Sequence, residues 1–425
     1  MSSLSSLVLV AWLSPEEFGL WASAVSACAV LVSLKNFGAS QAYLAGVTGS
    51  LRRTRKRAAL HNLCLALIAL VIAGVYFSFG RADIALLVAL VGLTIPLQGD
   101  ADLLYSETVR QRKNATAVRA QGIAALLKGG VGIAIAILTG SVAALAVSTI
   151  AYHFIVEVLL LSVAKKERNS VEKTATDSVI RSSARVSWAI NAMLLSLPLQ
   201  IPFLVAQFVA SAEQVGILYI AFQVSLGISG MVAVPLNRVA LSTLASVKDH
   251  LRARLAVDLG GVFVAGTTLL CAVISITGIL LQDVLPDQWQ TAVLPSVMLL
   301  ASLPVRILTP IVDGLQQAQG KWWQGSTYSG IDLLGTGLAT LVAATGDLVL
   351  TALALSVWKI LLGLTRSSLL LRNAGGVRLA ALQTVTVIGG VLLILSPSGV
   401  AWSVATVVFG AVAFGTSLRL VSKDG

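Results

Sequence analysis

Leu13-Ser-Pro-Glu-Glu-Phe-Gly19 opens the stretch of sequence that decides the fold. An apolar run follows to Leu34, and the stretch closes with the basic cluster Leu51-Arg-Arg-Thr-Arg-Lys-Arg57. An acidic turn, an apolar run of membrane length and a basic loop, in this order, are typical of a helix that crosses a bilayer. The rest of the chain varies the same pattern.

The composition excludes a water-soluble fold. The chain has 425 residues, of which 56% are hydrophobic and only 12% charged, and its mean hydropathy is +0.89. Soluble domains carry roughly 25% charged residues. Apolar runs of about 20 residues recur along the whole length, which is the signature of transmembrane helices. The sequence therefore predicts an all-α polytopic membrane protein with about 14 transmembrane helices.

Fourteen apolar segments support this prediction. They span residues 2–13, 18–36, 58–79, 82–104, 116–138, 140–163, 187–209, 214–237, 255–281, 291–311, 326–344, 347–366, 378–396 and 400–420. The first segment covers only about 20 Å of a hydrocarbon core of about 30 Å. We therefore expect this first helix to be truncated, with its N-terminal half missing from the sequence.

The charges of the connecting loops fit this count. One alternate set of loops holds seven acidic residues and a single basic one, Arg81. The other set, together with the C-terminus, holds 26 of the 30 Lys and Arg residues. Because cytoplasmic loops are enriched in Lys and Arg, both termini are expected in the cytoplasm of a cell with a bacterial-type plasma membrane.

The net charge of +11 does not indicate nucleic-acid binding. The basic residues sit in short loops, where anionic lipid headgroups and insertion bias account for them. The three cysteines fall in or beside apolar runs without metal-ligand spacing. We expect no metal site, no cofactor and no nucleic-acid partner.

An internal repeat is visible at an offset of 197 residues. Ser14-Pro-Glu-Glu-Phe-Gly-Leu aligns with Ser211-Ala-Glu-Gln-Val-Gly-Ile, and Arg55 and Arg57 align with Arg252 and Arg254. A parallel repeat of this kind predicts two six-helix lobes related by an axis along the membrane normal. The predicted domains are an N-lobe of residues 1–163, a cytoplasmic loop of residues 164–186, a C-lobe of residues 187–372 and two additional helices in residues 373–425.

Five short motifs carry a family resemblance. They are Leu13-Ser-Pro-Glu-Glu-Phe-Gly19, Leu34-Lys-Asn-Phe-Gly-Ala-Ser-Gln-Ala-Tyr43, Gln214-Val-Gly-Ile-Leu-Tyr-Ile-Ala-Phe222, Asp287-Gln-Trp-Gln-Thr-Ala292 and Gln316-Gln-Ala-Gln-Gly-Lys321. In order and spacing the chain resembles the multidrug/oligosaccharidyl-lipid/polysaccharide exporter superfamily, in its polysaccharide-transporter branch of Wzx-type O-antigen flippases.

The resemblance implies two six-helix bundles around a central cavity. It also implies alternating-access transport of a polyprenyl-diphosphate-linked oligosaccharide, an O-antigen or exopolysaccharide repeat unit, from the cytoplasmic to the outer leaflet. Its partners would be membrane lipids, a polysaccharide polymerase and glycosyltransferases. Relatives often carry a basic residue a few positions beyond Gly38. The matching residue in this chain is Gln41 or Tyr43, and neither is basic.

Ionisable groups within the membrane are the first candidates for a substrate site, because each costs roughly 2.5–3.5 kcal/mol on insertion scales. Lys128 and Lys359 lie near the middle of their segments and predict an anion-binding wall. For Lys128 the alternative is an ion pair with Glu157, or a contact with His153. No partner for Lys359 is evident from the sequence.

Three more candidates have both a functional and a structural interpretation. Arg306 either meets phosphate at the cytoplasmic mouth or pairs with Asp332 on the next segment. Lys35 and Arg238 either flank the substrate entrance or snorkel to the interface.

Amide side chains are the candidates for binding sugar hydroxyls, unless they serve as interhelical contacts. They are Asn191, Gln200, Gln207, Gln223 and Asn237. Glu157 and Asp332 are the candidate coupling-ion sites, because they are acidic residues placed within the span. We expect a transporter and no enzyme activity, since the outer loops are too short for the catalytic region of a glycosyltransferase. A drug transporter of the same superfamily remains the alternative.

Overall fold

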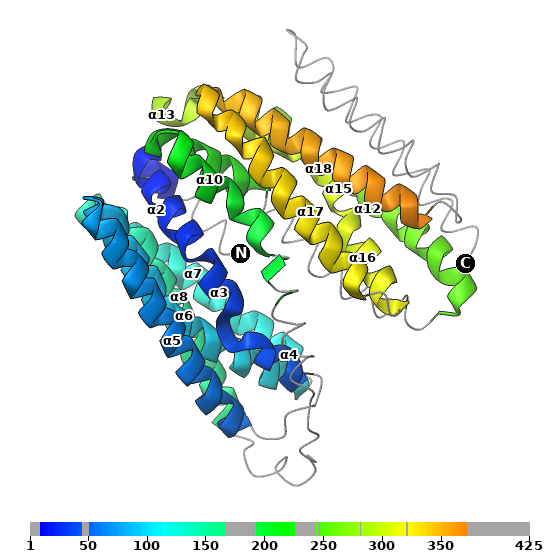
Figure 1. Cartoon of the computed structure of the whole chain (residues 1–425), viewed down its shortest axis with the longest axis horizontal. Coiled ribbons are helices and arrows are strands. Elements are labelled where there is room, and N and C mark those ends of the chain that lie inside the picture. The colour runs from blue at the N-terminus through cyan, green and yellow to red at the C-terminus, as the bar shows by residue number, and fades with distance from the viewer. Residues whose placement is uncertain are drawn as a thin grey trace. The chain divides into compact units, whose positions relative to one another are not determined.

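The computed structural model describes residues 9–44, 51–111, 113–165, 190, 193–194, 196–225, 244, 247–280, 282–319 and 322–371. These residues form helices, joined by short turns (Figure 1). The chain divides into two compact units, Met1–Gly216 and Ile217–Gly425, which are described separately below.

Four long helices form the main body of the first unit. They are α5 (Leu51–Ser78), α6 (Ala82–Arg110), α7 (Asn114–Thr139) and α8 (Ala143–Lys165), and α6 packs against both α5 and α8 (Figure 1). Small residues allow the close approach of α5 and α6, since a Cβ atom at Gly92 would meet the side chain of Ala69. Without a hydrophobic force between helices in lipid, such close packing is what holds them together.

The N-terminal part of the first unit is a bent series of short helices. After the turn η1 (Leu9–Ala11), the order is α2 (Pro15–Ala27), α3 (Ala29–Leu34), η2 (Lys35–Gly38) and α4 (Ala39–Leu44). The helix axis bends by 48° between α2 and the segment formed by α3 and η2. α2 begins with a capping box, in which Ser14 Oγ accepts from the Glu17 N–H and the Glu17 carboxylate accepts from the Ser14 N–H.

A second capping box lies at the equivalent position of the repeat. It follows η3 (Leu197–Leu199) and α10 (Ile201–Val209). The Ser211 N–H donates to Gln214 Oε1 at 3.1 Å, and the Gln214 N–H donates to Ser211 Oγ at 3.2 Å. The capping pairs Ser14/Glu17 and Ser211/Gln214 are 197 residues apart, as the sequence alignment has them.

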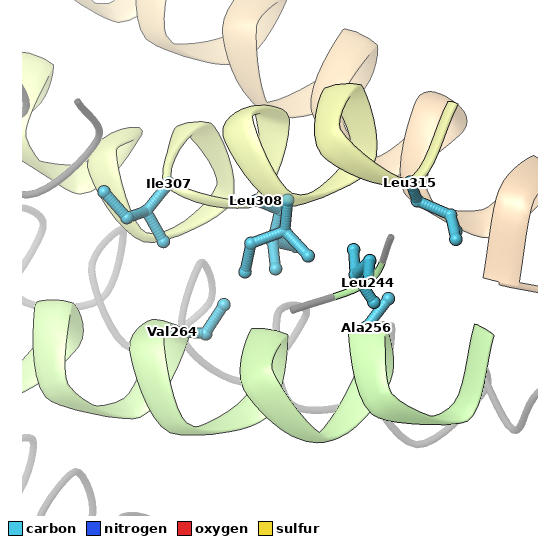
Figure 2. Close-up of a cluster of buried hydrophobic side chains, with 7 residues drawn as sticks. Leu244, Ala256, Val264, Ile307, Leu308 and Leu315 are labelled. Atoms are coloured by element: carbon cyan, nitrogen blue, oxygen red, sulfur yellow. The ribbon is translucent and has the colours of Figure 1, made fainter. Parts of the chain in front are cut away.

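The second unit is built on the long helix α12 (Asp249–Leu280). The chain continues through η4 (Gln282–Val284), α13 (Asp287–Gln290), α14 (Val293–Ala301), α15 (Leu303–Arg306), α16 (Leu308–Ala318), α17 (Trp322–Thr340), η5 (Leu341–Thr345) and α18 (Leu348–Leu371). Ala256 and Val264 of α12 pack against Ile307, Leu308 and Leu315 in a buried apolar cluster (Figure 2).

Within the described residues, six helices are long and apolar enough to cross a membrane, or up to eight if each of two bent pairs is one span. Two details differ from the sequence prediction. The basic run from Arg52 to Arg57 is not a loop, because it forms the first turns of α5. The predicted segment 291–311 is broken at Ser302, directly before the Leu303-Pro304 step.

Several predictions lie outside the described residues. These are the inter-lobe loop 164–186, the two segments 378–396 and 400–420, and most of the first segment. The count of 14 helices, the two-lobe division and the domain boundaries therefore stay predictions.

Candidate functional site

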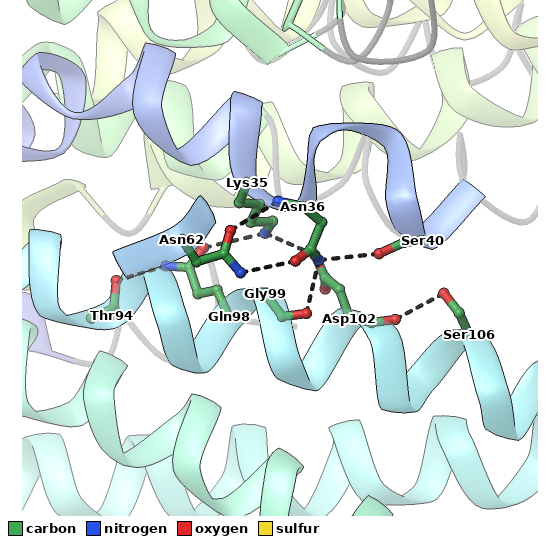
Figure 3. Close-up of polar contacts among 9 residues, drawn as sticks. All are labelled: Lys35, Asn36, Ser40, Asn62, Thr94, Gln98, Gly99, Asp102 and Ser106. Atoms are coloured by element: carbon green, nitrogen blue, oxygen red, sulfur yellow. Dashed lines mark hydrogen bonds and ion pairs between the residues drawn. The ribbon is translucent and has the colours of Figure 1, made fainter. Parts of the chain in front are cut away.

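The end of the first bent helix is held by a network of buried amides (Figure 3). Asn36 and Phe37 have positive φ angles of 61° and 42°, a conformation that L-residues rarely adopt. The Asn36 N–H donates to Asn62 Oδ1 at 2.9 Å, and Asn36 Nδ2 donates to the Gly99 carbonyl at 2.8 Å. A Cβ atom at Gly99 would overlap both asparagine side chains. The network thus stabilises a backbone conformation that costs free energy by itself.

Lys35 is positioned by this bend and reaches α6. Its ammonium lies 3.1 Å from the Asp102 carboxylate and donates to Gln98 Oε1 at 3.2 Å. Gln98 in turn donates to Thr94 Oγ1 at 2.8 Å. Lys35 therefore does not simply extend to the interface, because it is part of a polar strip along α6.

A second ion pair extends the strip. Arg55 of α5 contacts the Asp100 carboxylate with two nitrogens, of which Nε lies 2.6 Å from Oδ1. Glu157 of α8 acts electrostatically on this Arg55–Asp100 pair.

Lys128 of α7 is buried, with 8% of its surface exposed. Within the described residues no side chain forms a hydrogen bond or ion pair with it. The charges of Lys128 and Lys35 both act on the imidazole of His153 of α8. The alternative ion pair with Glu157 is not formed among the described residues, since Glu157 lies beside Asp100 and Arg55 instead.

In the second unit, Asp332 is the centre of the polar cluster. Lys359 Nζ donates to its two carboxylate oxygens at 2.7 and 2.8 Å, and Thr336 Oγ1 donates to it at 3.1 Å. Trp358 Nε1 also donates to Asp332, at 3.2 Å, which explains a tryptophan far from either membrane interface.

Arg306 lies near this cluster without joining it. Its Nη1 donates to Ser225 Oγ at 3.3 Å, while the charge of Asp332 acts on it from a greater distance. The structural alternative from the sequence, an Arg306–Asp332 pair, is thus replaced by the Lys359–Asp332 pair.

Sequence reasoning missed a third polar cluster, around Arg366. This side chain is 5% exposed, forms an ion pair with Asp313 and lies with its guanidinium carbon 5.2 Å from the centre of the Tyr328 ring. Gln316 accepts a further hydrogen bond from it. Its signal was present, since Arg366 and Asp313 lie near the inner ends of apolar segments.

The remaining candidates are not brought to one site by the described residues. Gln200 follows η3, and its buried Oε1 has no partner in the described part of the chain. Gln223 is half-buried in the helical residues 212–225. Arg238 and Asn237 lie outside the described residues.

Metal chemistry has no support in the described ranges. They contain no group of three or more His, Cys, Asp or Glu side chains that could hold an ion. Cys28, Cys64 and Cys271 are free thiols. What the described residues offer is fixed positive charge in apolar surroundings, at Lys128 and Lys359.

The model of a family described as "Polysaccharide biosynthesis protein" matches residues 8–294, more than half of the chain. No curated protein sequence matches the chain.

Two solved structures share the fold. A structure described as "Lipid II flippase MurJ, inward closed conformation" superposes with a TM-score of 0.62 at 13% identity, over 100% of this chain and 99% of that one. An inward-facing multidrug resistance MATE family transporter of the MOP superfamily has a TM-score of 0.62 at 13% identity, over 90% of this chain and 96% of that one. The predicted family resemblance is confirmed by the family match, and the chain shares the helical fold of these two membrane proteins.

Proposed function

The chain belongs to the polysaccharide biosynthesis protein family, and from this premise we propose that it is a lipid-linked oligosaccharide flippase. It would carry a polyprenyl-diphosphate-linked oligosaccharide, an O-antigen or exopolysaccharide repeat unit, across the cytoplasmic membrane by alternating access. A polymerase and glycosyltransferases would act on the same glycan. Both termini would be cytoplasmic, and the two six-helix lobes and fourteen helices belong to the same proposal.

The observation that carries the proposal is the buried ammonium of Lys128. Lys35 is offset by Asp102, whereas Lys128 is buried without an ion-pair partner among the described residues. A buried ammonium without a counterion is costly in the membrane, and a diphosphate would supply the missing charge. We assign the diphosphate to Lys128 and Lys35, while Lys359 is already engaged by Asp332.

Other residues keep secondary roles in this proposal. Arg238 and Arg306 would meet phosphate at the cytoplasmic mouth. Gln200, Gln223 and Asn237 would contact sugar hydroxyls.

Translocation in reconstituted vesicles tests the assignment. The Lys128→Ala variant should lower transport of radiolabelled lipid-linked oligosaccharide by roughly tenfold to a hundredfold, since a hydrogen bond to a charged group contributes about 1.5–3 kcal/mol. Lys128→Arg should keep most of the activity. The matched control is Lys248→Ala, because Lys248 is exposed. Wild-type transport by Lys128→Ala at a normal protein level would refute the cationic site.

The same structure supports alternating access through a contact at the two capping boxes. A Cβ atom at Gly19 would overlap the carbonyl oxygen of Ala212, and a Cβ atom at Gly216 would overlap that of Pro15. These four positions are equivalent in the repeat, because Pro15 aligns with Ala212 and Gly19 aligns with Gly216. The contact is reciprocal, as expected of two copies related by a two-fold axis. It would close one end of a transport pathway.

Of the two candidate coupling residues, Glu157 is favoured over Asp332. Asp332 already accepts hydrogen bonds from Lys359, Trp358 and Thr336, which leave little capacity for an ion. Glu157 instead is half-buried and acts electrostatically on the Arg55–Asp100 pair. We propose Glu157 as the proton site.

A small-molecule or drug transporter is the alternative, because the MATE transporter has the same fold. It predicts drug resistance on overexpression and normal surface glycan in a deletion strain. The flippase predicts the loss of surface glycan and lipid-linked repeat units left on the cytoplasmic leaflet.

A further inference from the structure

A small polar cavity lies at the end of the first unit where α5 ends and α6 begins. Its volume is about 340 Å³, and α2, the α5–α6 turn, α10 and the residues after α10 line it. α2 and α10 pack against each other at this place (Figure 1). The positive-inside rule assigns this end to the outer face of the membrane. The cavity is separate from Lys35 and Lys128, which contribute nothing to its lining.

The lining of the cavity includes a buried amide whose nitrogen lacks a partner. Gln207 is 7% exposed, and its Oε1 accepts a hydrogen bond from the Tyr76 hydroxyl at 3.2 Å. Its Nε2 is shielded from solvent and has no hydrogen-bond partner in the described part of the chain. Exchanging the two amide atoms would only move the deficit to the oxygen. Because a buried unpaired polar group costs free energy, a polar ligand that reached this amide would remove that cost.

The rest of the lining defines the chemistry of that ligand. Arg81 and Asp83 place one positive and one negative charge at the exposed rim, and Ser23 and Ser211 add hydroxyls. An anion would meet Asp83, a cation would meet Arg81, and an acyl chain would leave the Gln207 amide unpaired. A neutral ligand that both donates and accepts hydrogen bonds satisfies all of these groups, and the hydroxyls of a sugar do so.

The size of the cavity limits how much sugar it can take. A volume of about 340 Å³ is near the lower end of the roughly 300–1,000 Å³ typical of small-molecule sites. It suits one sugar residue, and neither a whole repeat unit nor a polyprenyl chain.

We propose that this cavity, around Gln207, binds a single neutral sugar residue of the glycan head group at the outer face. The class of ligand rests on the proposed flippase function, while the cavity and its unpaired amide do not. A weak site of this kind holds the head group after it has left Lys35 and Lys128 and before the transporter returns to its starting conformation.

Saturation-transfer NMR on the full chain in nanodiscs tests the site, with the methyl glycosides of glucose, galactose, N-acetylglucosamine and rhamnose as probes. At least one glycoside should receive transfer from the wild-type protein. Gln207→Leu should weaken its binding by at least about fivefold, the loss expected for one or two hydrogen bonds. Asp83→Asn, at the exposed rim and thus harmless to packing, should weaken it as well. Gln290→Leu is the control, because this glutamine lies in the second unit.

Two outcomes would overturn the proposal. One is no transfer to any of the four glycosides from the wild-type protein, and the other is equal transfer from the wild type and both cavity variants. Vesicle translocation separates this result from the function itself. Glycoside binding without translocation of lipid-linked oligosaccharide would refute the flippase function and retain the sugar site. Translocation without glycoside binding would retain the flippase function and refute the sugar site.

Discussion

Lys359 of α18 donates to both carboxylate oxygens of Asp332 on α17, at 2.7 and 2.8 Å, and joins two helices across 27 residues of sequence. The side chain of Trp358 completes the arrangement, because its indole donates to the same carboxylate. Gly335 leaves room for the indole, since a Cβ atom there would overlap the ring. The pair satisfies two charges that would each be costly alone within apolar segments.

Breaking this pair on one side should destabilise the protein more than removing it completely. We expect Lys359→Met or Asp332→Leu alone to lower the free energy of unfolding by about 3 kcal/mol, because each leaves one charge buried and unpaired. The double variant should recover much of the loss. Unfolding by titration with a denaturing detergent measures all three. A double variant as unstable as the sum of the single ones would show that the two residues act independently.

The contact of Gly19 with Ala212 should be intolerant of any side chain. Gly19→Ala and Gly216→Ala should separate the two helix starts, because a Cβ atom at either glycine overlaps a backbone oxygen. The separation is measured with a Ser23→Cys substitution in a background without the native cysteines. This cysteine should react faster with a membrane-impermeant thiol reagent in both glycine variants. Gly122→Ala and Gly130→Ala are matched controls, since nothing lies within 4 Å of a Cβ atom there.

Unchanged labelling in both glycine variants would contradict the interpretation of this contact as a closure. Faster labelling in the control variants as well would show a general loosening of the fold.

The bend after α3 should depend on Asn62. Asn62→Leu removes the acceptor of the Asn36 N–H. It also removes Asn62 Nδ2, which donates to Asn36 Oδ1 at 2.9 Å. Leaving these buried groups unpaired should cost about 1–3 kcal/mol each at most. Asn36→Gly, which tolerates the positive φ, should cost less than Asn62→Leu. Equal stability of Asn62→Leu and wild type would show that the amides do not hold the bend.

Glu157 should control the response of transport to a pH gradient. Glu157→Gln removes the carboxylate of the proposed proton site, so transport driven by an imposed pH gradient should fall severalfold. Transport driven only by the substrate gradient should change less. Glu213→Gln is the matched control, because Glu213 is exposed. A full pH response in Glu157→Gln would exclude this residue as the coupling site.

The amino-acid sequence predicted the long helices of the first unit most accurately. Apolar length and loop charge predicted helices close to those found for α6, α7 and α8, because lipid solvates any apolar helix of sufficient length. The spacing of Ser14 and Ser211 also predicted two equivalent helix starts, and capping chemistry is local enough to be recognised within four residues.

The polar contacts between helices could not be predicted from the sequence in this way. The sequence placed Lys359 and Asp332 within the span but did not pair them, and it placed Arg55 in a basic loop, whereas the structure turns it from α5 toward Asp100. It offered no sign that Asn36 and Phe37 would adopt positive φ angles.

By itself the sequence determined that this chain is a multi-pass helical protein, and it predicted the depth of the charged residues and the two repeated segments. Only the tertiary structure decided which charges neutralise each other and which, like Lys128, have no ion-pair partner among the described residues. The reason is physical. Insertion into lipid depends on the composition of each helix taken alone, whereas the choice of an ion-pair partner depends on which faces of distant helices meet.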